Sequence, residues 1–305
     1  MATTETRQFA REQTGALLRS LDVEIGHAVQ SCTPDAVHDV RVAIRRFGQS
    51  IAVFKPCFPG KDVRKIRRRL KDVMKTAGHV RDCDVALKLL AKSRLPNGAI
   101  PAKVRARRKD AARVLVGELK SWTDRQMSIK WRAALEAAIA KNGGDFGTAS
   151  VDANAGRILR RMTKDFFQSG NDAAGAKATP QDLHKFRIVA KKFRYSLELF
   201  APVYGAVLES RLARMKEAQS LLGDVNDCET VGDLVAELGG GGGLVARLKK
   251  RQRKKTGEFR QFWRADFQGG EHLQSWEDAL RSHPMRKPAA RAGSLSSRKT
   301  ATSKA

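Results

Sequence analysis

One segment of this 305-residue chain occurs twice, and this repeat constrains the fold more than any other feature. Residues 33–56 read TPDAVHDVRVAIRRFGQSIAVFKP, and residues 179–202 read TPQDLHKFRIVAKKFRYSLELFAP. The residues shared at one constant offset are Thr33, Pro34, His38, Arg41, Phe47, Ser50, Phe54 and Pro56, matched by Thr179, Pro180, His184, Arg187, Phe193, Ser196, Phe200 and Pro202. Such a repeat indicates two copies of one structural unit.

Each copy predicts an amphipathic helix with a cationic face. A threonine followed by a proline is typical of a helix start, because the hydroxyl caps the first turn and the proline loses no hydrogen bond there. At about 100° per residue, His38, Arg41 and Arg45 share one face, and apolar residues lie opposite. The second copy has the corresponding face His184, Arg187 and Lys191. Because a histidine and an arginine occur at equivalent positions of both copies, we favour a functional face over a merely solvated one.

A third predicted helix, residues 61–77, is also cationic on one face. Its basic residues are Arg64, Arg67, Arg68, Lys71 and Lys75, and Ile66, Leu70, Val73 and Ala77 lie opposite. Like charges one turn apart cost roughly 0.2 to 0.5 kcal/mol per pair, which an anion bound between them would offset. The alternative is a solubilising face with counterions. The corresponding helix of the second copy, residues 206–222, keeps only Lys216 and Arg214, so the first copy is expected to contribute more positive charge.

Two glycines follow these basic helices. Gly78 and Gly223 fit helix ends, where a left-handed residue suits glycine. Asp82 and Asp227 are then placed to cap the next helices. The alternative is that these carboxylates reach back toward the cationic side chains.

The composition favours an all-α fold with an anionic partner. The chain is rich in Ala, Arg, Lys and Leu, and its formal net charge is +27. Such an excess indicates nucleic acid, an anionic membrane or an inorganic polyanion. The four cysteines show no CxxC spacing and no secretory signal precedes them, so we expect free thiols and a cytoplasmic location. No apolar run approaches the length of a membrane span.

The repeat predicts two halves and a tail. We expect a first helical-bundle half at residues 1–142 and a second at 143–282, with helices over 151–282. Residues 283–305 are expected to be a disordered basic tail. The chain holds seven Lys or Arg and no acidic residue from position 281 onward, so the rest carries +20, that is +27 less seven. The basicity therefore belongs to the folded part.

The residue pattern favours binding over catalysis. There is no phosphate-binding glycine loop, no HExxH and no pair of carboxylates beside a nucleophile. Guanidinium and ammonium groups are the donors that phosphate oxygens require. His38 and His184 could in principle accept a phosphoryl group, which remains the enzymatic alternative. A metal site lacks ligands at chelating spacing, and the nearby arginines would repel a cation.

At this point the residues resemble a known family. The pair VHDVRVAIRRF and LHKFRIVAKKF, followed downstream by GHVRDCDV and GDVNDCET, is similar to the CHAD family, the conserved histidine α-helical domain. The resemblance covers residues 3–282 and identifies the chain as a stand-alone member. It implies one CHAD domain made of two pseudo-symmetric helical bundles around a basic central groove or pore that binds inorganic polyphosphate.

The resemblance and the helix faces together give the predicted site. Its candidate polyphosphate-binding residues are His38, Arg41, Arg45, Arg46, Arg64, Arg67, Arg68, Lys71, Lys75, His184, Arg187, Lys191, Lys192, Arg194 and Lys216. The predicted function is non-catalytic polyphosphate binding, with targeting to polyphosphate or storage granules. No cofactor or metal is expected. The alternative is a nucleic-acid-binding or nucleoid-associated protein, for which the basic tail would be a second contact.

Overall fold

The computed structural model describes residues 2–92, 98–141 and 149–281. Throughout these residues the secondary structure consists of α-helices and two short 3-10 turns, with no strand. The predicted all-α class is confirmed. None of the helices described is long and apolar enough to cross a bilayer.

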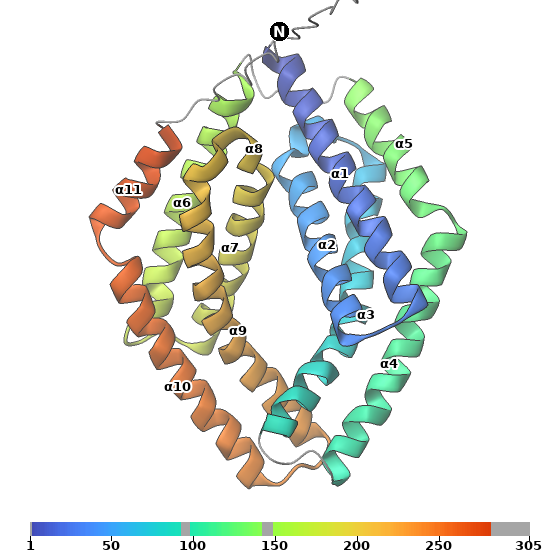
Figure 1. Ribbon diagram of the computed structural model, residues 1–305, viewed down its shortest axis with the longest axis vertical. Helices are drawn as coiled ribbons and strands as arrows, with labels where there is room; N and C mark the ends of the chain where they lie inside the picture. Colours follow the sequence, from blue (N-terminus) through green and yellow to red (C-terminus); the bar gives the residue numbers. More distant parts are fainter. Residues whose placement is uncertain (1, 93–97, 142–148, 282–305) are drawn as a thin grey trace, which may run out of the picture.

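The helices form two sets that lie side by side (Figure 1). The first set is α1 (Ala2–Gln30), α2 (Pro34–Val53), α3 (Lys61–Lys92), α4 (Ala99–Asp124) and α5 (Met127–Ala140), with a 3-10 turn at Lys55–Cys57. The second set is α6 (Val151–Ala174), α7 (Pro180–Leu199), α8 (Ala201–Tyr204), α9 (Glu209–Glu237), α10 (Gly242–Asp266) and α11 (Gly270–Arg281), with a 3-10 turn at Gly205–Leu208. The predicted boundary at 142 and the predicted tail lie outside the residues described.

The two repeated segments become α2 and α7, and both begin as predicted. The Thr33 hydroxyl accepts a hydrogen bond from the Ala36 backbone N–H at 3.1 Å. Thr179 accepts one from the Asp182 N–H at 3.3 Å, and the Asp182 carboxylate accepts from the Thr179 N–H at 3.0 Å. This reciprocal pair is a capping box, which satisfies two donors that the first turn would otherwise leave unpaired.

The predicted helix ends at Gly78 and Gly223 are wrong. Both α3 and α9 continue through their glycine, so Asp82 and Asp227 lie in the middle of helices and cap nothing. A reason is visible at Gly78, where an added Cβ would lie 3.2 Å from an Arg41 guanidinium nitrogen. The glycine makes room for this side chain, and that tertiary contact outweighs the roughly 1 kcal/mol by which glycine weakens a helix interior.

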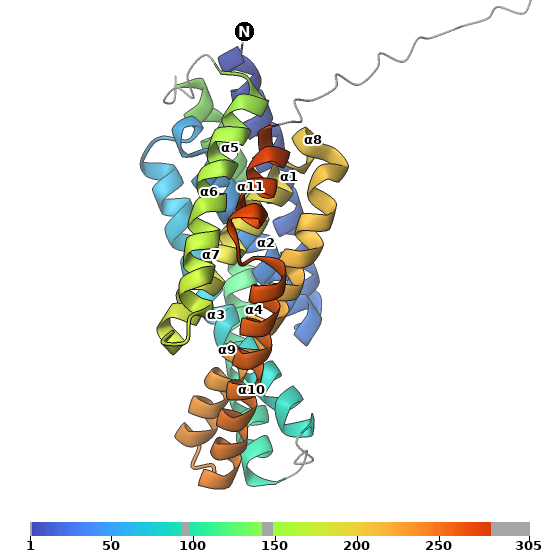
Figure 2. The same ribbon diagram turned by 90° about the vertical axis from the view of Figure 1, so that its left-hand side faces the viewer.

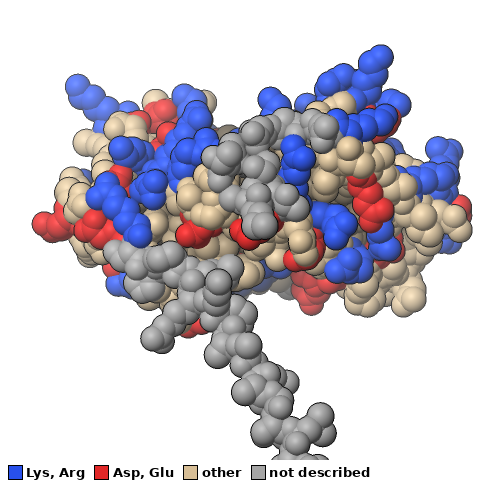
Figure 3. Space-filling view, turned by 90° about the horizontal axis from the view of Figure 1, so that it is seen from above, with Lys and Arg blue, Asp and Glu red and all other residues tan. Residues whose placement is uncertain are grey.

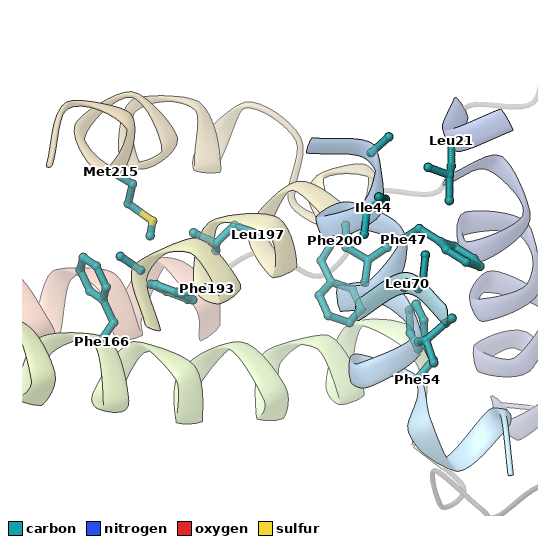
Figure 4. Packing of buried hydrophobic residues seen from close by; sticks show 14 of the residues in the cluster. Leu21, Ile44, Phe47, Phe54, Leu70, Phe166, Phe193, Leu197, Phe200 and Met215 are labelled. Atoms are coloured by element: carbon teal, nitrogen blue, oxygen red, sulfur yellow. The ribbon is translucent and has the colours of Figure 1, made fainter. Parts of the chain in front are cut away.

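The two sets pack together through aromatic side chains at the carboxyl ends of α2 and α7 (Figure 4). The rings of Phe54 and Phe200 are 5.7 Å apart, and Phe9 of α1 lies 6.0 Å from each of them. Phe54 and Phe200 belong to one continuous core that runs through both sets, and Phe9 is a partly buried residue that packs against it. This packing fixes α2 beside α7, which places their cationic faces near each other.

A second, smaller core joins the sets at the opposite end of the molecule (Figures 1 and 2). It contains Cys83, Val85, Ala86, Leu90 and Val104 from α3 and α4, and Val231, Leu234, Val235 and Leu248 from α9 and α10. Polar contacts reinforce it, since Lys103 donates to the Leu238 carbonyl at 2.9 Å and Arg107 pairs with Glu237 at 2.7 Å. The sets are therefore held together at two places, and the site described next lies between them.

Candidate anion-binding site

A cavity of about 470 Å³ lies where α2 and α3 of the first set face α7 and α9 of the second. Seven lysine or arginine residues line it, together with His38 and three aspartates. The cations are Arg41, Arg45, Arg81, Arg187, Lys191, Arg194 and Lys216, and the carboxylates are Asp82, Asp224 and Asp227. The cationic faces of both repeated helices therefore meet at one cavity.

Seven of the predicted site residues line this cavity, and eight do not. Those that line it are His38, Arg41, Arg45, Arg187, Lys191, Arg194 and Lys216. His184 and Lys192 are exposed elsewhere on α7. Arg46 pairs with Glu198 at 2.9 Å, and both line a smaller pocket beside α1.

The five predicted residues of α3 lie on its exposed surface. Arg64 and Arg67 line a separate pocket next to Pro56 and Phe58. Successive helical turns place Arg64, Arg68, Lys71, Lys75 and Gly78 on the same face as Asp82. This cationic row therefore leads away from the cavity along α3 without lining it.

Arg81 is the main residue that the sequence did not single out. It lines the cavity from α3, one residue before Asp82. Its segment was expected to follow a helix end, which hid the fact that α3 continues toward the other set. The polar residues Gln219 and Asn226 of α9 also line the cavity, and the sequence did not single them out.

Most of the cations in the cavity have no protein partner. Within the part of the chain described, Arg45, Arg81, Arg187, Lys191 and Lys216 form neither a hydrogen bond nor an ion pair. The Nε atoms of Arg187 and Arg194 are buried without any hydrogen-bond partner. Buried polar groups are normally satisfied, so several such donors gathered around one cavity are suited to a ligand that supplies acceptors.

Several arginines outside the cavity are paired with carboxylates. Arg108 pairs with Asp84 at 2.5 Å, Arg69 with Glu118 at 2.8 Å, and Arg107 with Glu237. On the end of the molecule seen in Figure 3, cationic side chains stand among acidic and neutral ones. Other unpaired cations lie on exposed helix faces, so what distinguishes the cavity is that its unpaired cations converge on one space from four helices.

Burial and mutual repulsion perturb the cations of the cavity. Burial first, and then the positive charges of Arg187, Arg45 and Arg41, lower the pKa of Lys191 to about 6, although the Asp227 carboxylate acts to raise it. Burial and Arg45 lower the pKa of Arg41 to about 10. The pKa of Arg187 is lowered mainly by burial. The common causes are burial and the closeness of like charges, both of which disfavour the positively charged form of a side chain.

His38 and two of the aspartates that line the cavity also have shifted pKa values. Burial and the charge of Arg81 lower the pKa of His38, which favours its neutral form. Burial raises the pKa of Asp82 and of Asp227, although the surrounding arginines oppose that shift. Neither carboxylate forms an ion pair within the described residues, so they leave the cations free for another acceptor. Across these same residues, no group of three His, Cys, Asp or Glu is placed to hold a metal ion.

The fold and the site define an all-helical protein with one strongly cationic cavity between two sets of helices. A family model described as the CHAD domain matches residues 12–236. The chain therefore belongs to the CHAD domain family. No curated protein in the comparison matches the sequence.

Two solved structures share the fold. One is described as the crystal structure of the CHAD domain from the plant Ricinus communis, with 19% identity, a TM-score of 0.65, and coverage of 93% of this chain and 95% of that one. The other is PptA from Streptomyces chartreusis, with 17% identity, a TM-score of 0.60, and coverage of 83% and 99%. At these identities the likeness shows the fold alone.

Proposed function

We propose that this protein binds inorganic polyphosphate in the cavity between α2, α3, α7 and α9, without catalysing a reaction on it. The observation that carries the proposal is the set of unpartnered cations that converge there from four helices. Family membership supports it, because the resemblance in the sequence implied the same ligand.

Polyphosphate matches the chemistry of the cavity. It carries charged oxygens along its whole length, so cations on opposite walls can bind neighbouring phosphates at once. Arginine gives each phosphate two directional hydrogen bonds, and lysine adds a compact positive charge. A chain of phosphates is also slender enough to enter a cavity of about 470 Å³.

A nucleic acid fits the cavity less well. A duplex is wider than its own major groove, which is about 12 Å across. It would therefore be too wide to enter the cavity and would contact only the outer surface of the protein. A single strand would need aromatic side chains for stacking, and Tyr195 is the one aromatic residue among those lining the cavity.

Competition tests the choice between these ligands. We expect long-chain polyphosphate to bind with an affinity that falls steeply as salt is raised, because binding releases counterions. Duplex DNA at equal phosphate concentration should displace little of it. Displacement by DNA at comparable concentration would contradict the proposal. Shortening of polyphosphate during prolonged incubation with divalent metal would instead show an enzyme.

We also infer that the protein associates with polyphosphate granules in the cytoplasm. A fluorescent fusion should co-localise with granules and become diffuse when Arg41 and Arg187 are replaced by glutamate. Granule association that survives this change would contradict the role of the cavity. Deleting residues 281–305 in the same fusion separates any contribution of the tail.

Gly78 offers a test of how the cavity is built. Gly78→Ala should keep or raise the free energy of unfolding, by up to about 1 kcal/mol, because alanine favours a helix. The new Cβ would press on Arg41, whose Nη1 donates to the Met74 carbonyl at 3.1 Å. We therefore expect tripolyphosphate to bind roughly two- to tenfold more weakly, the value of one disturbed hydrogen bond.

Gly223→Ala is the matched control for that variant. Gly223 is also in mid-helix, and although it lines the cavity, an added Cβ there would meet no atom within 4 Å. It should gain helix stability without loss of binding. Thermal unfolding and calorimetric titration measure both quantities, and equal binding by the two variants would contradict the role assigned to Gly78.

The relative importance of Lys216 and Lys71 provides another test. The sequence alone predicts a larger effect at Lys71, because its helix carries more charge. The structure places Lys216 at the cavity and Lys71 on the outer surface of α3. We expect Lys216→Gln to weaken tripolyphosphate binding roughly tenfold, and Lys71→Gln less than about twofold. The reverse order would place the ligand on α3.

A further inference from the structure

Helix α10 carries a second concentration of unpaired positive charge, away from the cavity lining. Residues 247–255 read RLKKRQRKK, with seven lysines or arginines and no acidic residue. This segment lies beyond residues 12–236, the part matched by the family model. Neither the family match nor the cavity therefore explains it.

The packing of α10 directs these cations outward. Leu248, Phe259 and Trp263 are buried, and α10 lies along α9 on the outer side of the molecule (Figures 1 and 2). Five cations on the remaining faces are exposed and, among the residues described, form no hydrogen bond or ion pair. They are Arg247, Lys249, Lys250, Arg253 and Lys254.

The basic segment begins at the rim of the cavity. The Nζ atom of Lys255 lies 3.3 Å from an Asp224 carboxylate oxygen and 2.7 Å from Glu258. Asp224 is itself one of the residues that line the cavity. From position 255 to position 247 the helix rises about 12 Å. The cations of α10 therefore lead away from the cavity across the outer surface.

This arrangement weakens the helix unless an anion covers it. Lys250 has like charges three or four residues away at Arg247, Arg253 and Lys254. Each such pair costs a few tenths of a kcal/mol, and no carboxylate offsets it within the segment. A solvated surface would tolerate the charges, but it would not require them to follow directly from Lys255 at the cavity rim.

We propose that α10 is a second binding surface for the same ligand. A polyphosphate chain too long for the cavity leaves it past Asp224 and continues along residues 247–254. This inference rests on the proposed function and extends it, since it makes affinity depend on chain length. The cavity alone holds a short chain, whereas a long chain also contacts α10.

The test compares two triple variants with equal charge. In the α10 variant, Lys250, Arg253 and Lys254 are each replaced by glutamine. In the control, the replaced residues are Lys120, Arg125 and Lys130, exposed cations near the α4 to α5 turn that make no ion pair in the residues described. Glutamine suits a helix, and Arg125 lies in the exposed turn after α4, so both variants should fold. Binding of tripolyphosphate and of long-chain polyphosphate is titrated at fixed salt.

We expect the α10 variant to bind long chains roughly tenfold more weakly and tripolyphosphate less than about twofold more weakly. The control should bind both ligands like the unmodified protein. Equal losses in the two variants would show an effect of net charge and overturn the inference, as would an unchanged affinity of the α10 variant for long chains. If the unmodified protein binds neither ligand, the proposed function fails. If it binds tripolyphosphate but gains nothing from longer chains, only this inference fails.

Discussion

Replacing both Arg41 and Arg187 with glutamate should weaken polyphosphate binding by at least about a hundredfold while the protein stays folded. The two side chains face the same cavity from α2 and α7, and each hydrogen bond between charged groups contributes roughly 1.5 to 3 kcal/mol. Reversal of charge adds repulsion to the loss of both contacts. Calorimetric titration at moderate salt measures the change.

The fold should survive because these arginines contribute little to it. Arg41 donates one hydrogen bond, to the Met74 carbonyl, and Arg187 makes none within the residues described. Circular dichroism and thermal unfolding check this point. The matched control is Lys120→Glu with Lys130→Glu, which changes the net charge equally at exposed positions outside the cavity. An unchanged affinity in the double arginine variant would rule out the cavity as the binding site.

Lys191 should take up a proton when polyphosphate binds. Its pKa in the empty cavity is lowered to about 6, chiefly by burial and then by Arg187 and Arg45, so the amine is mostly neutral at pH 7. A bound polyanion supplies the opposite charge and raises that pKa. Affinity should therefore be level below pH 6 and weaken above it, by at most about one logarithmic unit per pH unit, until the pH reaches the raised pKa.

Calorimetry in two buffers of different ionisation enthalpy counts the proton directly. Lys191→Arg is the control, because arginine remains charged across this range and should bind without proton uptake at position 191. The phosphates' own titration contributes equally to both proteins, so it cancels when the proton uptake of the variant is subtracted from that of the unmodified protein. Equal proton uptake by the two proteins would show that Lys191 is not the group that titrates.

The same lysine should lower the stability of the empty protein. The unfolded chain holds the proton up to the ordinary pKa of 10.5, whereas the folded state holds it only below about 6. Since the unfolded state binds more protons between these values, this group's contribution to stability rises with pH across that window. Lys191→Met should therefore raise the free energy of unfolding by roughly 1 to 4 kcal/mol at pH 7 and lower the affinity for polyphosphate. A gain in stability together with a loss of affinity is what we expect of a residue that serves binding.

The sequence could predict the parts that depend on one helix at a time. The cap residues Thr33 and Thr179 and the apolar backs of α2 and α7 follow from local rules, and the structure has both. It could also predict that Arg41 and Arg187 occupy equivalent places. These features depend on the helical period, which one sequence displays directly.

The remainder depends on contacts between helices. Gly78 was interpreted as a helix end because local propensity favours that, whereas the Arg41 side chain fills the space that the glycine leaves. That error hid Arg81. His184 and Lys192 share the pattern of the repeat, yet they lie outside the cavity because its extent depends on how α7 faces α3 and α9. No single helix contains that information.

The most direct test of the central claim is a crystal structure of the protein with bound tripolyphosphate. We predict phosphate oxygens within hydrogen-bonding distance of Arg41, Arg187 and Lys191, inside the cavity between α2, α3, α7 and α9. Phosphates seated only on the outer surfaces of α3 or α10, with the cavity cations still unpartnered, would contradict the account.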